Sequence, residues 1–214
     1  MDDKQRATRA VEILKTVYPE ATCALQWGGQ DGWKLLVMGR LSAQCKDSTV
    51  NEVCVGLFEV YPTLEALAEA SEEHIEEIIH KCGLFRSKAR DIKKACRMLI
   101  DEFDGVVPDE MDALLQIPGV GRKIANLLLG DLYHKSGIVA DTHCMRICGR
   151  LGFYEEGKKD PLKTERIMSK LVEPEEQSDF CHRIVQFGRD VCDSRVPKCG
   201  ECPLGEICKG RRSV

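Results

Sequence analysis

The segment whose residues are best suited to binding or catalysis is a glycine-rich turn that precedes a helical pattern. Residues 116–123 are Gln-Ile-Pro-Gly-Val-Gly-Arg-Lys. Gly119 and Gly121 permit positive φ angles and close approach of another backbone, so we expect a compact hairpin rather than a continuous helix. A 3.6-residue apolar period then predicts a helix from Arg122 to Leu132. The N-terminus of that helix would direct unpaired N–H groups and a positive dipole end outward, which suits a phosphate.

Simpler explanations of this segment stay open on the sequence alone. A glycine-rich turn before a helix also occurs as a plain connection that binds nothing. Lys123, the second residue of the expected helix, is by default an exposed surface lysine.

Four of the 12 cysteines crowd into the last 23 residues with the spacing C-x6-C-x2-C-x5-C. They are Cys192, Cys199, Cys202 and Cys208, and the prolines and glycines between them provide turns that can wrap the chain around one metal centre. Disulfides are the alternative, which a reducing compartment disfavours. Zinc and a [4Fe–4S] cluster both accept four thiolates in a tetrahedral array, so ligand chemistry does not separate them. We expect the other eight cysteines to be reduced and mostly buried.

The length and charge of the chain limit what it can be. Its 214 residues allow one or two domains. There is no 18-residue apolar run, and the N-terminus is too charged for a secretory signal, so we expect a cytoplasmic protein without a membrane partner. The formal net charge of −4 means that any nucleic-acid site must be a local basic face on an acidic body.

Charge changes sign between two neighbouring helical segments. Residues 65–77 contain six glutamates and no lysine or arginine, so this surface would repel a nucleic acid. The next helix is expected to begin at Ser87, and basic residues surround Asp91 there: Arg86, Lys88, Arg90, Lys93, Lys94 and Arg97. A solvated helix face explains part of this run, but the contrast favours an edge that faces phosphates.

No segment alternates convincingly between apolar and polar residues, so we predict an all-α fold. A long connection over residues 19–32 follows the first amphipathic helix, and we interpret it as a crossing between domains. The expected helix N-caps are Asp47, Thr63, Ser71, Asp109, Asp141 and Asp160.

Several of these motifs resemble those of the endonuclease III family, which are helix-hairpin-helix DNA glycosylases and AP lyases. The resemblance covers nearly the whole chain, from the segment of Gln44 to Cys208, and includes the hairpin, the cysteine spacing, and Lys123 followed 18 residues later by Asp141. Residues 83–88, Gly-Leu-Phe-Arg-Ser-Lys, also resemble a family motif, although arginine stands where we expect asparagine.

The resemblance implies a bifunctional enzyme of base excision repair that acts, as a monomer, on double-stranded DNA with a damaged base or an abasic site. Such an enzyme removes oxidised pyrimidines and cleaves 3′ to the abasic site by β-elimination. By resemblance, Lys123 is the nucleophile that forms a Schiff base. Asp141 orients or deprotonates this lysine and stabilises positive charge on the sugar. His143, in the same motif, is expected to be packed or bonded near the aspartate.

The resemblance also assigns contacts to DNA. It implies that Gln44 fills the gap left by an extruded base and that Leu84 is a wedge that helps to unstack the duplex. On sequence alone, Gln44 is equally an amide bonded at a helix end, and Leu84 is a packed hydrophobe. The remaining expected contacts are the hairpin residues Pro118, Gly119, Val120, Gly121 and Arg122, and Lys198 on the cysteine loop.

The family fold has two helical domains. The resemblance implies a six-helix domain over residues 25–135 that carries the hairpin, and a second domain over 1–24 and 136–214. It also favours a structural [4Fe–4S] cluster over zinc at the four cysteines. Three other functions stay open: a monofunctional mismatch glycosylase of the same superfamily, a noncatalytic DNA-binding module, and an electron-transfer iron–sulfur protein.

Overall fold

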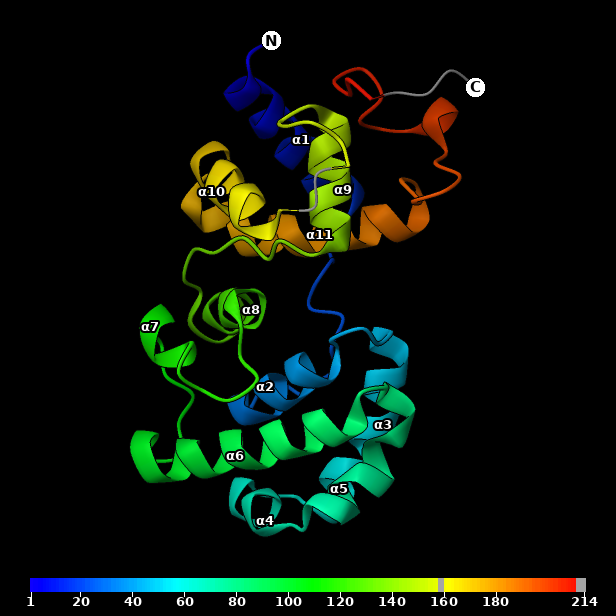
Figure 1. Cartoon of the computed structure of the whole chain (residues 1–214). Coiled ribbons are helices and arrows are strands. Elements are labelled where there is room, and N and C mark those ends of the chain that lie inside the picture. Colours follow the sequence, from blue (N-terminus) through cyan, green and yellow to red (C-terminus); the bar gives the residue numbers. More distant parts are fainter. Residues whose placement is uncertain (158–159, 211–214) are drawn as a thin grey trace. The chain divides into compact units, whose positions relative to one another are not determined.

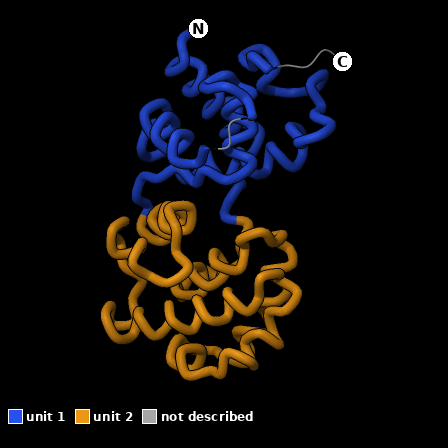
Figure 2. The backbone as a smooth tube through the Cα atoms, viewed as in Figure 1, with its two compact units in different colours: residues 1–23, 134–214 blue, residues 24–133 orange. Residues whose placement is uncertain are grey.

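The computed structural model describes residues 1–157 and 160–210. All regular elements in these two ranges are helices, which confirms the all-α prediction (Figure 1). The chain divides into two compact units (Figure 2). Unit 1 consists of Met1–Cys23 and His134–Val214, and unit 2 is Ala24–Tyr133. Within the described ranges, no helix has the length and apolar character needed to cross a membrane.

Unit 1 joins the N-terminal helix to the C-terminal part of the chain. Its α-helices are α1 (Asp3–Val17), α9 (Thr142–Leu151), α10 (Pro161–Leu171) and α11 (Gln177–Asp190), with short 3-10 turns at η2 (Pro174–Glu176) and η3 (Cys199–Glu201). Helices α1 and α9 both pack on α11 and also contact α10. The apolar face of α11 supplies Phe180, Ile184 and Phe187, all of them buried in the core of this unit.

Unit 2 is built around one long helix. Its elements are α2 (Gly32–Leu41), α3 (Asp47–Val60), α4 (Leu64–Glu69), α5 (Glu72–Ile79), η1 (His80–Cys82), α6 (Phe85–Phe103), α7 (Met111–Leu114) and α8 (Arg122–Tyr133). Helix α6 contacts α2, α4 and α5, while α8 contacts α2 and α7. The predicted hairpin lies between the end of α7 and the start of α8.

Local capping explains several helix starts. Four predicted N-caps are confirmed, since each side chain accepts a backbone N–H three residues later: Thr63, Ser71, Asp141 and Asp160. Three predicted starts are wrong by one or two residues. The N-caps are Lys46 rather than Asp47 and Glu110 rather than Asp109, and α6 begins at Phe85 rather than Ser87. Helix α6 begins early because Leu84 adopts a left-handed conformation with φ 48° that turns the chain directly into the helix.

Candidate functional site

The hairpin between α7 and α8 is a tight turn fixed by its own backbone. The Val120 N–H donates to the Ile117 carbonyl at 3.0 Å, and the Ala125 N–H donates to the Gly121 carbonyl at 2.9 Å. The two glycines serve different purposes. Gly119 has a φ of +79°, whereas Gly121 has an ordinary φ, and a Cβ atom added at Gly121 would meet nothing within 4 Å. Positive φ is therefore needed only at Gly119, and Gly121 leaves the backbone accessible to a ligand.

Gly119 lies against an ion pair that connects α2 and α6. The Arg40 Nε and Nη2 atoms donate to Oδ2 of Asp91 at 3.0 and 2.7 Å. A Cβ atom at Gly119 would lie only 2.6 Å from Cδ of Arg40. The hairpin therefore rests on the Arg40 side chain, and Asp91 holds that side chain in place. The sequence analysis did not identify Arg40, and no local pattern connects it to an aspartate 51 residues away.

Lys123 is exposed at the second position of α8, immediately after the hairpin. Arg122, at the first position, is also exposed. The amine of Lys123 is thus accessible from solvent and follows a turn whose backbone amides suit a phosphate.

Asp141 is half-buried as the N-cap of α9, in unit 1. Its Oδ1 atom accepts the Cys144 N–H at 2.7 Å, which fixes the carboxylate in position. The neighbouring His143 Nδ1 lies 3.2 Å from Nη2 of Arg146 and faces Gly188 of α11. His143 is therefore packed within its own unit. Because Lys123 belongs to unit 2 and Asp141 to unit 1, the pairing of these two residues stays a prediction.

Gln44 and Leu84 share an unusual backbone conformation. Both have positive φ angles, 53° and 48° respectively, which cost an ordinary L-residue about 1–3 kcal/mol. Leu84 is 58% exposed, so it is not the packed hydrophobe that its sequence alone allowed. In the described part of the chain, the exposed Gln44 amide makes no hydrogen bond, so it does not bond to a helix end. Backbone strain of this kind is often found at functional positions.

Only part of the basic run on α6 is exposed. Lys88, which the sequence analysis placed on this exposed face, is instead completely buried. Arg97 forms an ion pair with Glu69 of α4 and is not available as an isolated cation. Arg86, Arg90 and Lys94 remain exposed. The correction for Lys88 follows from its place on the apolar stripe that includes Ile92 and Leu99.

The four C-terminal cysteines line one cavity in unit 1. Cys192, Cys199, Cys202 and Cys208 are half-buried around it, and apolar side chains such as Leu151 and Phe187 form the remaining wall. Among the described residues, no group of three or more His, Cys, Asp or Glu side chains converges closely enough to hold a single metal ion. The thiols therefore surround a space instead of meeting at one point.

Arg150 connects the two ends of this cysteine loop. Its Nη1 atom donates to the Asp193 carbonyl at 2.7 Å and to Sγ of Cys192 at 3.3 Å. Its own carbonyl accepts from the Gly210 N–H at 2.7 Å and from Sγ of Cys208 at 3.3 Å. Sequence analysis missed this residue, because an arginine in the last turn of a helix is ordinarily exposed. Lys198 is exposed on the loop.

Comparisons with known proteins agree with the arrangement in each unit. The HhH-GPD superfamily base excision DNA repair protein profile matches residues 37–174. Endonuclease III of Synechocystis sp. (strain ATCC 27184 / PCC 6803 / Kazusa) is 45% identical over 206 residues, which cover 96% of this chain and 92% of that protein. Endonuclease III of Escherichia coli K12 is 34% identical over 99% of each chain.

Solved structures give the same result. The chain matches a structure of a non-covalent Endonuclease III–DNA complex and one of a trapped Endonuclease III–DNA covalent intermediate, each with a TM-score of 0.91, 38% identity, and 98% of this chain and 97% of that chain covered. A thermostable thymine-DNA glycosylase shares the fold with a TM-score of 0.84 at 21% identity. The chain therefore belongs to the endonuclease III family, the DNA glycosylases and AP lyases within the HhH-GPD superfamily of base excision DNA repair proteins.

Proposed function

We propose that this chain is a bifunctional glycosylase and lyase for oxidised pyrimidines in double-stranded DNA, with Lys123 as nucleophile and Asp141 as its partner. The observation that carries the proposal is an exposed primary amine one residue beyond a phosphate-binding type of hairpin. It acts as a monomer in the cytoplasm. In this proposal the hairpin belongs to a six-helix domain over residues 25–135, and residues 1–24 with 136–214 form the second domain.

Binding begins at the hairpin. Backbone N–H groups around Gly119 and Gly121 hold a phosphate beside the lesion, because the first turn of α8 has unpaired donors and a positive dipole end. A base inside a duplex is unreachable, so the nucleotide must be flipped out. Leu84 and Gln44, both exposed in turns, enter the stack and occupy the space that the base leaves. Arg122 and Lys198 contact the DNA backbone.

Base release follows at the sugar. The neutral amine of Lys123 attacks C1′, the glycosidic bond breaks, and the base leaves with the bonding electrons and takes up a proton. The Asp141 carboxylate, fixed by its bond to the Cys144 N–H, accepts the proton from the lysine and stabilises positive charge on the sugar.

After base release, the nitrogen of Lys123 is bonded to C1′. Its lone pair forms the C=N bond as the C1′–O4′ bond breaks, and O4′ takes up a proton as the sugar ring opens. Strand cleavage then uses this Schiff base between Lys123 and C1′. The imine withdraws electrons and acidifies the proton on C2′. Loss of that proton forms a C1′–C2′ double bond conjugated to nitrogen, and the C3′–O bond breaks with departure of the phosphate on its 3′ side. Water finally hydrolyses the imine and returns Lys123 as a free amine.

A [4Fe–4S] cluster held by Cys192, Cys199, Cys202 and Cys208 would supply structural support. Zinc needs four sulfur atoms about 2.3 Å from one point, whereas these thiols surround a cavity. A larger group with one cysteine on each iron fits that arrangement better. With the group bound, the four cysteines would hold the loop that carries Lys198 in place. Iron and sulfide analysis, with zinc analysis as the comparison, tests the assignment.

A nicking assay separates this proposal from a monofunctional glycosylase. Duplex DNA with one oxidised pyrimidine is incubated with the protein, and half of each sample then receives hot alkali. A bifunctional enzyme produces the same amount of cleaved strand with and without alkali. If cleavage requires alkali, the chain is monofunctional. If neither sample is cleaved although DNA is bound, the chain is a noncatalytic binding module.

A further inference from the structure

Lys88 is the only lysine among the fully buried large side chains of the described residues. It lies in the first turn of α6 with no exposed surface. Its Nζ atom donates to the Leu41 carbonyl at 2.8 Å and to the Cys82 carbonyl at 2.5 Å. In the described ranges, no carboxylate lies within ion-pair distance of this ammonium. Main-chain carbonyls are therefore its hydrogen-bonding partners.

The two carbonyls belong to the ends of two helical segments. Leu41 is the last residue of α2, and Cys82 is the last residue of η1. Carbonyls at such ends lack intrahelical donors. A single ammonium satisfies both of them. Burial lowers the pKa of Lys88, so the charged form is retained at a cost that an apolar residue of similar size would not have.

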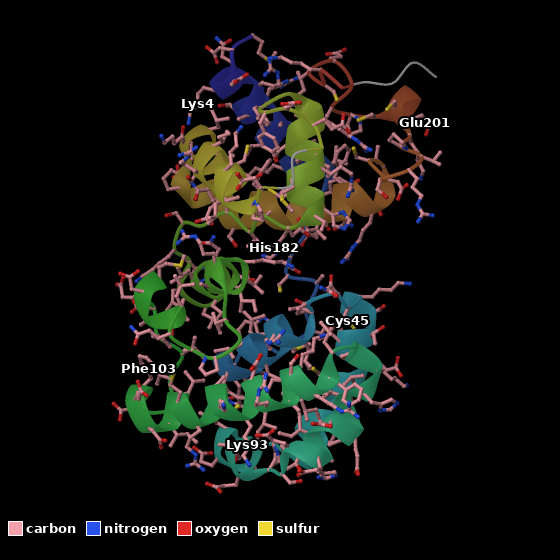
Figure 3. The ribbon with its side chains drawn as sticks, in the orientation of Figure 1. Lys4, Cys45, Lys93, Phe103, His182 and Glu201 are labelled. Carbon is pink, nitrogen blue, oxygen red and sulfur yellow. The ribbon has the colours of Figure 1, made fainter. Side chains whose placement is uncertain are left out.

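Each of these carbonyls lies two or three residues before a residue with a strained backbone. Gln44 follows Leu41 by three residues, and Leu84 follows Cys82 by two; Cys45, labelled in Figure 3, comes directly after Gln44. Both turns contain a non-glycine residue with positive φ. The Leu84 carbonyl is held further by Oγ of Ser87 at 3.0 Å and by the backbone N–H of Lys88 at 3.1 Å. Lys88 is thus bonded to the main chain beside both turns.

We propose that Lys88 is a positioning residue that fixes the separation of Gln44 and Leu84, so that the two side chains enter the duplex as one unit. This inference rests on the proposed function, in which both residues enter DNA. It adds that the two turns are coupled through one buried ammonium. Weakening of that link displaces both side chains together, whereas the chemistry at Lys123 of α8 is left intact.

The first test uses Gln44 and Leu84. Both side chains are exposed, so we expect their alanine variants to fold. Gln44→Ala, Leu84→Ala and the double variant are compared in single-turnover base release from a lesion-containing duplex at saturating enzyme. Coupled residues give a double variant that loses little more rate than the worse single variant. If the two losses multiply, the residues act independently and the proposal is wrong.

The second test replaces the ammonium itself. Lys88→Met leaves both carbonyls without a donor, and we expect about a 100-fold loss of base release from the duplex, as misplacement by about 1 Å produces. Cleavage of an abasic site in single-stranded DNA, which needs no unstacking, should fall less than threefold. 2-Aminopurine opposite an abasic-site analogue should also lose the fluorescence increase that reports unstacking on binding.

Two controls separate positioning from general stability. Lys94→Met removes an exposed lysine from the same helix, and Leu67→Ala destabilises the packing of α4 on α6 away from both turns. Neither should change the ratio of duplex to single-strand activity. An equal loss of both activities in Lys88→Met, matched by Leu67→Ala, shows a merely structural lysine and overturns the proposal. Should Lys88→Met not fold, Lys88→Gln and the first test decide.

Failure of the proposed lyase function can be distinguished from failure of the positioning role by the activity of the wild type. If the wild type itself does not cleave abasic DNA, the lyase function is wrong whatever Lys88 does. If the wild type cleaves and the Lys88 variant retains the normal ratio of activities, only the positioning role is lost.

Discussion

Arg40 and Asp91 form a two-donor ion pair on which Gly119 of the hairpin rests. The pair connects the end of α2 to the first half of α6. Lys88, one turn earlier on α6, bonds to the carbonyl of Leu41, which follows Arg40. The turn that carries Gln44, the turn that carries Leu84 and the hairpin are thus all held from the same region of α6.

Gly119→Ala tests the contact between the hairpin and the Arg40 side chain. The added Cβ would have both a positive φ and a contact of 2.6 Å with Arg40, so we expect a loss of about 1–3 kcal/mol in the free energy of unfolding. Affinity for a duplex with an abasic-site analogue should fall as well. Gly121→Ala, with an ordinary φ and nothing within 4 Å, is the matched control and should unfold like the wild type in urea. Equal stability of the two variants would contradict this account.

Asp91→Asn tests the ion pair itself. The exchange retains the shape of the side chain and removes its charge, so the Arg40 guanidinium loses charge-assisted hydrogen bonds in a mostly buried site. We expect about 1–2 kcal/mol less stability and weaker DNA binding. Asp101→Asn, at an exposed position of the same helix, should change neither quantity. Wild-type affinity in Asp91→Asn would show that the hairpin does not depend on the pair.

Arg150→Met tests the closure of the cysteine loop. The variant loses the bonds from the guanidinium to the Asp193 and Ser194 carbonyls, both of which are under 3 Å long. We expect faster loss of the bound metal centre, followed as decay of visible absorption in the presence of a chelator. Arg166→Met, an exposed arginine on α10, serves as control. Identical decay in both variants would remove the structural role assigned to Arg150.

The buried thiols of unit 2 predict a loss of stability at high pH. Burial raises the pKa of Cys54 and of Cys96 to about 12, from 9.0 in the unfolded chain. Between these values the folded state binds more protons, so stability falls as pH rises from about 9 towards 12, by up to about 1.4 kcal/mol per pH unit for each thiol. Cys96→Ala should show a smaller slope in urea unfolding across this range. An unchanged slope would mean that Cys96 ionises normally.

The sequence predicted features that depend on neighbouring residues and missed those that depend on distant ones. The caps Thr63, Ser71, Asp141 and Asp160 were predictable because the cap bond spans three residues. The early start of α6 was not, since it requires a leucine in the left-handed region, which sequence preference disfavours.

The burial of Lys88 could have been predicted from the apolar period of α6, but its basic neighbours favoured an exposed position. Its spacing of four, eight and 11 residues from Ile92, Cys96 and Leu99 follows the buried stripe of α6, so periodicity indicated an interior position. The pairs Arg40–Asp91 and Arg150–Asp193 join residues more than 40 positions apart, and no local pattern indicates them.

Borohydride trapping is the most direct test of the central claim, that the Lys123 amine attacks the sugar. Wild-type protein, incubated with a duplex containing an oxidised pyrimidine and then reduced, should give a covalent protein–DNA complex whose adduct maps by peptide mass to Lys123. Lys123→Gln should bind the same duplex and give no complex, while Arg122→Gln at the adjacent position should still be trapped. Trapping at another lysine, or undiminished trapping in Lys123→Gln, would contradict the account.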